Sequence, residues 1–192
     1  MGGNLYFKGE TDMENQKVRL VLAEESMAEQ AAEFYKRNQE FWRPFEPERS
    51  GEYFTAGYQR GILGQEEEER RDGRTFRFFI KESGAPDRII GSIGLSEVVR
   101  GCFQSCYLGY KMDREFCKKG YMTTAVSMIT EYAFGGLALH RIEANVMPGN
   151  LASLRVLEKN GFIWEGLSRK YLKINGVWED HVHMVKLNDA IE

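Results

Sequence analysis

Residues 106–122 read CYLGYKMDREFCKKGYM, and this stretch decides the fold. Leu108, Tyr110 and Met112 fall on one side of a two-residue repeat, which predicts a half-buried strand. After the basic turn, apolar residues recur at three- and four-residue spacing, so a helix is expected to begin at Gly120. Residues 141–162, RIEANVMPGNLASLRVLEKNGF, predict a second strand, a helix capped by Asn150 and a glycine stop.

The turn at Gly120 is typical of an anion site. Backbone N–H groups at a helix start have no intrahelical partners, and the positive end of the macrodipole lies there, so a pyrophosphate is stabilised. Lys118 and Lys119 add positive charge. A single turn of this kind is more often a solvated surface turn, but the full order of strand, turn, helix, strand and capped helix favours a phosphate site.

These segments resemble the Gcn5-related N-acetyltransferases (GNAT family), whose acetyl-coenzyme A motif is Gln/Arg-x-x-Gly-x-Gly/Ala at a helix start. This chain has Cys117-Lys118-Lys119-Gly120-Tyr121-Met122, in which the middle Gly matches while Cys117 and Met122 depart from the motif. The segments His140-Arg141-Ile142, Met147-Pro148-x-Asn150-x-x-Ser153 and Asn160-Gly161-Phe162 are similar to the RimJ/RimL-like branch, which acetylates N-termini of ribosomal proteins. Cys106-Tyr107-Leu108-Gly109-Tyr110 and Pro44-Phe45-Glu46-Pro47 resemble its alanine-specific type, and the likeness covers about residues 18–187.

The expected architecture is a single-domain α/β GNAT fold. Strands interleave with helical regions along the chain, which predicts a mixed central sheet of about seven strands flanked by about four helices. Ser26 is expected to cap the start of one helix, and a second helical region is expected from about residue 52 to residue 71. A hairpin is expected around Asn175-Gly176. The resemblance implies that the strands over 106–113 and 142–146 splay apart and hold the cofactor arm. The domain is placed at residues 17–192, after an extension at 1–16 whose segment NLYFKG resembles a protease-tag remnant or is a native leader.

Acetyl-CoA is the expected cosubstrate. The resemblance implies that the cofactor-binding residues are Met112, Cys117, Lys118, Lys119, Gly120, Tyr121, Met122, Thr123, Asn150 and Ser153. Asn150 as a cap alone and Ser153 as an ordinary first-turn residue are the alternatives. His140, His181 and His183 form no metal-binding pattern with the cysteines, so no metal is expected.

Acetyl transfer to an amine requires a neutral nucleophile and protonation of the departing thiolate. Many relatives use a Tyr four residues before the Gly of the last motif, but that position is Leu157 here. Ser153 is therefore the candidate acid. Glu46 is the candidate base, ranked above Glu97 and His181, each of which has a purely structural alternative.

The bulk properties agree with one folded enzyme domain. The 192 residues are 42% hydrophobic, the formal net charge is −3, and no apolar run is long enough to span a bilayer. The N-terminus also lacks the hydrophobic core of a secretory signal, so a cytoplasmic protein without a membrane partner is expected, and three cysteines do not form a disulfide framework. The net charge argues against a nucleic-acid partner, and a monomer or homodimer is expected.

The expected function is acetylation of the N-terminal α-amine of an alanine-starting ribosomal protein by direct transfer. One alternative is a GNAT enzyme that acetylates a small amine such as an aminoglycoside, an amino acid or a polyamine. Another is a noncatalytic acyl-CoA-binding module, which the absence of Tyr at Leu157 would favour.

Overall fold

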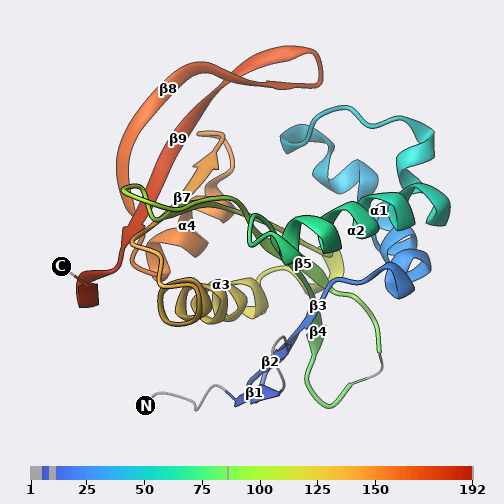
Figure 1. Ribbon diagram of the computed structural model, residues 1–192. Helices are drawn as coiled ribbons and strands as arrows, with labels where there is room; N and C mark the ends of the chain where they lie inside the picture. The colour runs from blue at the N-terminus through green and yellow to red at the C-terminus, as the bar shows by residue number, and fades with distance from the viewer. Residues whose placement is uncertain (1–5, 9–11, 86, 192) are drawn as a thin grey trace.

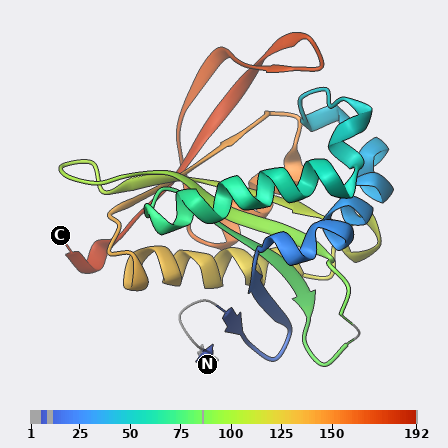
Figure 2. The same cartoon turned by 45° about the vertical axis from the view of Figure 1, so that its right-hand side comes forward.

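The computed structural model describes residues 6–8, 12–85 and 87–191, which form one open mixed sheet flanked by helices (Figures 1 and 2). The strands are β1 (Tyr6–Lys8), β2 (Asp12–Glu14), β3 (Val18–Leu22), β4 (Phe76–Glu82), β5 (Gly91–Val99), β6 (Ser105–Met112), β7 (Arg141–Val146), β8 (Ile163–Ile174) and β9 (Val177–Leu187). Their order is β1-β2-β3-β4-β5-β6-β7-β9-β8, and among these described strands only the β6–β7 pair is parallel. The α-helices are α1 (Ala28–Trp42), α2 (Ala56–Arg71), α3 (Tyr121–Glu131) and α4 (Leu151–Lys159).

The predicted fold class is confirmed, with nine strands among the described residues in place of about seven. The additional strands, β1 and β2, come from the segment set apart from the domain, and Met13 of β2 is buried in the core. No helix in the described part of the chain combines the length and apolar character needed to cross a membrane.

Two hydrophobic cores lie on opposite faces of the sheet. On β4, Phe78 and Ile80 pack with α3 and α4, whereas Phe79 packs on the other face with α1 and α2. The alternation follows from the two-residue period of a strand. The two faces of β6 therefore meet different helices, which matters for the site.

Most local signals act as predicted. The Asn150 side chain accepts from the Ser153 amide at the start of α4. At its end, Phe162 N–H donates to the Leu157 carbonyl and Gly161 N–H to that of Glu158, which is a Schellman motif. Asn175 and Gly176, both with positive φ, form the β8–β9 turn.

The predicted Ser26 cap is wrong. Ser26 lies inside a short 3₁₀ turn, Glu25–Met27, and the residue before α1 is Met27, which makes no side-chain capping bond. The 3₁₀ turn ends at Met27 and continues without a break into α1 at Ala28, so α1 begins from this turn and not from a capping side chain.

The central strands diverge. β6 and β7 pair only at Ser105–Arg141, Cys106–Ile142 and Tyr107–Glu143, although both strands continue beyond these residues. Past Tyr107, β6 is bonded to β5 but not to β7, so its second edge keeps free backbone groups within the described chain. The predicted splay is present, and we call the point at Tyr107 and Glu143 the fork.

Candidate functional site

The start of α3 forms a cradle of backbone amides. Gly120 has φ of 80° and is the residue before the helix, a conformation that glycine adopts without strain. Within the described residues, Thr124 N–H bonds the Gly120 carbonyl, whereas the backbone N–H groups of residues 118–123 have no acceptor. Lys17, which the sequence-based assignment missed, places its Nζ 2.9 Å from where a Cβ on Gly120 would lie.

The predicted cofactor residues in this cradle differ in what they offer. Lys118 and Lys119 are exposed cations, and Lys119 Nζ lies 4.8 Å from the Phe116 ring centroid. The side chains of Tyr121 and Met122 are buried, so these residues, with Thr123, offer their amides. Met112 is also buried, and its carbonyl accepts from Trp42 Nε1 at 2.9 Å.

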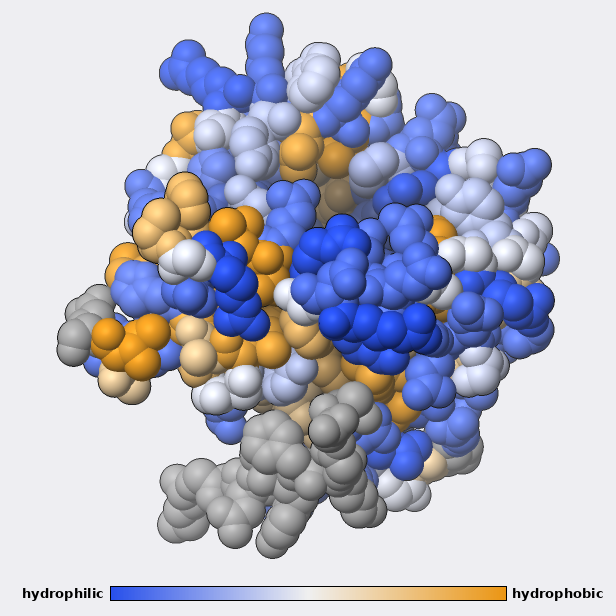
Figure 3. All heavy atoms as spheres, viewed as in Figure 1, coloured by the Kyte–Doolittle hydropathy of each residue, from blue (hydrophilic) through white to orange (hydrophobic). Residues whose placement is uncertain are grey.

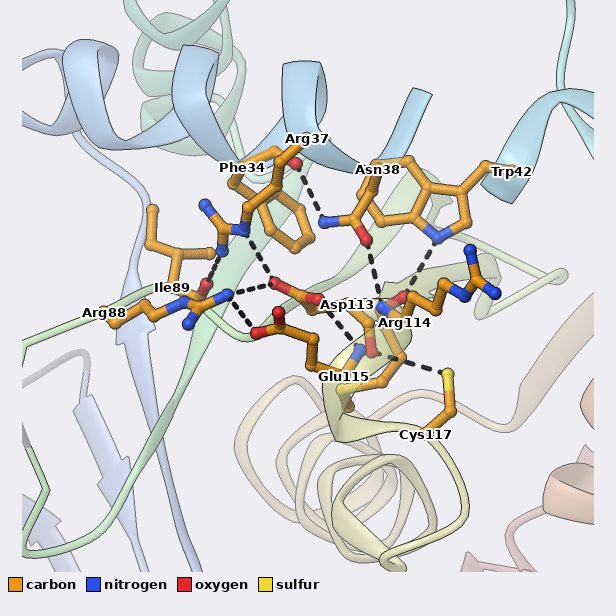
Figure 4. A network of polar contacts seen from close by, with 11 residues as sticks. Phe34, Arg37, Asn38, Trp42, Arg88, Ile89, Asp113, Arg114, Glu115 and Cys117 are labelled. Atoms are coloured by element: carbon orange, nitrogen blue, oxygen red, sulfur yellow. Dashed lines mark hydrogen bonds and ion pairs between the residues drawn. The ribbon is translucent and has the colours of Figure 1, made fainter. Parts of the chain in front are cut away.

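Asp113 anchors the segment between β6 and the cradle (Figure 4). Its buried carboxylate accepts from Arg37 at 2.7 Å, from Arg88 at 3.1 Å and from the Glu115 amide at 3.1 Å. Burial alone would raise the pKa of Asp113, but these hydrogen bonds hold it below its usual range. Cys117 Sγ donates to the Asp113 carbonyl, and burial raises the pKa of this thiol, so the Cys117 side chain belongs to the anchor.

Ser153 lies across the splay from β6. Its hydroxyl is 2.8 Å from the Tyr110 hydroxyl, which also donates to the Ser153 carbonyl at 3.2 Å. Burial raises the pKa of Tyr110, so this hydroxyl stays protonated at neutral pH. Leu157, at the position where many relatives have a Tyr, is fully buried in the core. The phenol beside Ser153 comes instead from Tyr110, which the sequence analysis did not assign to the site.

Glu46 lies on the opposite face of the sheet. Its carboxylate binds Lys111 Nζ at 2.7 Å, and Lys111 is stacked 5.7 Å from the centroid of the Trp42 ring. A pocket of about 360 Å³ opens here, and it is lined by Tyr35, Trp42, Glu46, Tyr53, Lys111 and Asn175, among others. Asn175, at the tip of the β8–β9 hairpin, closes it by donating to the Arg43 carbonyl at 2.6 Å.

The hairpin rises above this face and arches toward the segment that follows α1 (Figures 1 and 2). In the space-filling view, the visible face is largely hydrophilic, with hydrophobic residues gathered at its left and in a recess below the hairpin (Figure 3). Of the other candidates for the base, Glu97 lies at a β-bulge with φ of 48°, and His181 is buried with Nδ1 against the Glu179 carbonyl.

The residues fit a CoA thioester. The open amides at Gly120 and the cations Lys17, Lys118 and Lys119 match a pyrophosphate. The free edge of β6 matches the amides of a pantetheine arm, which can pair with it as an added strand does. A metal-binding group of three or more His, Cys, Asp or Glu side chains does not occur in the described ranges.

Known proteins share this arrangement. A model of the acetyltransferase (GNAT) domain family matches residues 17–163. The chain belongs to the GNAT acetyltransferase family. This confirms the predicted family and the predicted acyltransferase activity.

Two curated relatives of this GNAT acetyltransferase cover most of its length. It is 42% identical over 161 residues to the probable N-acetyltransferase YjcK of Bacillus subtilis (strain 168). This match covers 84% of this chain and 88% of that protein. It is 38% identical over 152 residues to the ribosomal protein uS5-alanine N-acetyltransferase of Escherichia coli (strain K12). This match covers 79% of this chain and 77% of that enzyme.

Solved structures agree. The ribosomal-protein-S5-alanine acetyltransferase from Vibrio fischeri superposes with a TM-score of 0.90 at 34% identity, covering 95% of this GNAT enzyme and all of that chain (100%). Mycobacterium smegmatis RimJ in complex with CoA-disulfide gives 0.84 at 28% identity, covering 91% and 83%. A CoA-bound neighbour of this similarity supports the use of acetyl-CoA by this enzyme.

Proposed function

We propose that this enzyme transfers the acetyl group of acetyl-CoA directly to the N-terminal α-amine of a ribosomal protein that begins with alanine. The observation that carries the proposal is the 38% identity, over 79% of the chain, to an enzyme named for that acceptor. The pocket at Glu46 supports it, because it is lined by Lys111 of β6 and opens on the sheet face opposite Ser153, where an acceptor is separated from the thiolate-side residues.

The cradle binds the pyrophosphate, and Asp113 holds the cradle to α1 through Arg37. Asn150 orders the first turn of α4 and thereby positions Ser153. The bound cosubstrate supplies an activated acetyl group at the splay. Ser153 donates a proton to the departing sulfur, and the neighbouring Tyr110 hydroxyl restores that proton.

An α-amine suits this site physically. Its reference pKa is about 2.6 units below that of a lysine side chain, so its deprotonation near neutral pH costs about 3.5 kcal/mol less. A weak base is sufficient for such a nucleophile. Glu46 stands as the predicted base on the acceptor face.

A thiol-release assay with matched acceptors tests the proposal. We expect turnover of a peptide that begins with Ala and none of the same peptide with a blocked N-terminus. Aminoglycosides, free amino acids and polyamines form the second panel. Turnover of small amines alone would reject the protein acceptor, and CoA binding without any turnover would reject catalysis.

Glu46→Gln tests the predicted base. If Glu46 takes the amine proton, the acidic limb of the pH profile of kcat/KM shifts in this variant, because the group that must be deprotonated is gone. Glu48→Gln is the control, since Glu48 lines the same pocket without the ion pair to Lys111. An unshifted acidic limb in Glu46→Gln rejects Glu46 as the base and leaves it a partner of Lys111.

A further inference from the structure

Three strands bring a serine, a histidine and a glutamate into one hydrogen-bonded chain. Ser168 Oγ on β8 lies 2.7 Å from His183 Nε2 on β9, and His183 Nδ1 lies 2.8 Å from Glu143 Oε1 on β7. Both His183 and Glu143 side chains are largely buried, at 18% and 16% exposure. This chain is independent of Glu46 and Ser153.

The carboxylate fixes the protons on the imidazole. Burial alone would raise the pKa of Glu143, but bonds from Arg141 and His183 lower it, so Glu143 is an anion that only accepts. His183 Nδ1 must therefore carry the donated hydrogen. In the neutral imidazole Nε2 is then an acceptor, and it receives the hydroxyl hydrogen of Ser168.

The hydrogen-bonded group of Ser168, His183 and Glu143 lies at the fork. Glu143 pairs with Tyr107 in the last β6–β7 pair before the strands diverge. From Met112, next to the cradle, to Tyr107 is five residues, or about 17 Å of strand. An extended pantetheine arm that starts at the cradle and follows the free edge of β6 therefore runs past Tyr110 and points its thioester end toward the fork.

The same hydrogen-bonded group also lies on the sheet face of the Glu46 pocket. Tyr107, Gly109 and Lys111 share one face of β6 because side chains alternate along a strand, and Lys111 lies in the pocket with Glu46. A Cβ on Gly109, between the fork and the pocket, would meet nothing within 4 Å. The surface from the pocket to His183 is thus open at its midpoint.

Two further features mark the surroundings of Ser168 and His183 as a built site. Register shifts in β8 occur on both sides of it, between Trp164 and Gly166 and between Ser168 and Leu172, and bulges of this kind re-aim side chains near active sites. Asn145, directly opposite His183 in the β7–β9 pair, has a buried side-chain oxygen without a hydrogen-bond partner in the described chain. A buried oxygen of this kind is unusual in a folded protein and marks a candidate contact for a ligand N–H.

We propose that Ser168 and His183 form the proton relay that deprotonates the acceptor amine, with Glu143 as the positioning residue and Asn145 as an amine-binding residue. This rests on the proposed function, because it deepens the chemistry of the same acceptor face. In this proposal the relay replaces Glu46 as the base. Glu46, whose carboxylate is paired with Lys111, then orients the acceptor, and Glu46→Gln is expected to leave the acidic limb unshifted.

The proton and electron balance is complete. As the amine nitrogen bonds the acetyl carbon, the carbon–sulfur bond breaks, and the sulfur takes a proton from Ser153. One nitrogen proton passes to Ser168 Oγ while the Ser168 hydroxyl proton moves to His183 Nε2, and Glu143 balances the imidazolium. His183 then releases its proton to solvent, and solvent restores the Ser153–Tyr110 pair.

The test combines kinetics with binding on the full chain. The titratable and charged groups around His183 are Glu143 and Arg141 on β7, Glu165 and Tyr171 on β8, and Tyr107 on β6. Glu165→Gln is the matched control, because Glu165 bonds Arg141 but not His183. The variants are His183→Gln and Ser168→Ala, assayed with an Ala-starting peptide, with CoA affinity measured by calorimetry.

We expect His183→Gln to lower kcat/KM for the peptide about 100-fold and to flatten the acidic limb of its pH profile, with CoA affinity unchanged. Ser168→Ala should lower kcat/KM about tenfold, and Glu165→Gln should stay within about twofold of wild type. A wild-type rate and acidic limb in His183→Gln would overturn the proposal. If that variant does not fold, Ser168→Ala decides, and a wild-type rate overturns the relay.

Failure of the proposed function gives a different pattern. If the wild-type enzyme acetylates a small amine and no peptide, the protein acceptor is rejected, and the same variants assayed with that amine still decide on the relay. An equal loss of rate in Glu165→Gln and His183→Gln would show a purely structural network and overturn the relay. An absence of turnover with every amine would overturn both proposals.

Discussion

At the level of single residues, the contact between Ser153 and Tyr110 predicts how the leaving thiolate is protonated. We expect Ser153→Ala to lower kcat about 100-fold and Tyr110→Phe about tenfold, with the KM for acetyl-CoA changed by less than about threefold, because the hydroxyls act as the sulfur departs. Tyr132→Phe is the control, since Tyr132 packs edge-on against Phe78 in the core. Unchanged kcat and kcat/KM in Ser153→Ala would remove Ser153 from the chemistry.

Asp113 predicts a pH-dependent stability. Its pKa is lowered in the fold, so its contribution is present above the unfolded value of about 3.9 and is lost as the pH falls through the folded value. Asp113→Asn should cost about 2 kcal/mol at pH 7, because Arg37 and Arg88 lose their shared anion. Urea unfolding at pH 7 and pH 3 measures this difference, which should shrink below about pH 4. Asp72→Asn, in an exposed pair with Arg74, should cost less than about 0.5 kcal/mol.

At the level of elements, the sequence predicted what adjacent residues determine. Asn150, Gly161 and the Asn175-Gly176 turn act within a few residues of chain, so their patterns were sufficient. Ser26 failed because a 3₁₀ turn competes with a capped helix start over the same residues. No local pattern encodes the contacts between Tyr110 and Ser153, Glu46 and Lys111, or Glu143 and His183, which join residues 43, 65 and 40 positions apart and are made by tertiary packing.

The start of α3 gives the prediction for an element. Gly120→Ala should weaken CoA binding at least tenfold, because a Cβ would lie 2.9 Å from Lys17 Nζ and would strain a residue with φ of 80° at the amide cradle. Gly101→Ala is the matched control, since Gly101 has φ of 72° in open space away from the cradle. Calorimetry with CoA measures both variants, and equal affinities would contradict a pyrophosphate site at Gly120.

For the whole molecule, the splay makes one sheet serve two faces. Tyr110 and Lys111 are neighbours on β6, yet the first meets Ser153 on the α4 side and the second meets Glu46 on the α1 side. The free edge between them is open to both faces of the sheet, so in the proposed mechanism the leaving sulfur and the incoming amine use different faces. This separation follows from strand alternation and requires no movement of the helices.

The closure of the acceptor pocket is a property of the whole molecule, because it joins the last hairpin to the segment after α1. Asn175→Gly keeps the positive φ of the turn but removes the donor to the Arg43 carbonyl, and Asn175→Asp keeps the turn with an acceptor in its place. Loss of one hydrogen bond of about 0.5–1.5 kcal/mol should raise the KM for the peptide about two- to tenfold in both variants, with kcat and CoA affinity within about twofold. Steady-state kinetics with an Ala-starting peptide measure this. A KM that stays at the wild-type value in both variants would mean that peptides enter the pocket without passing the hairpin tip.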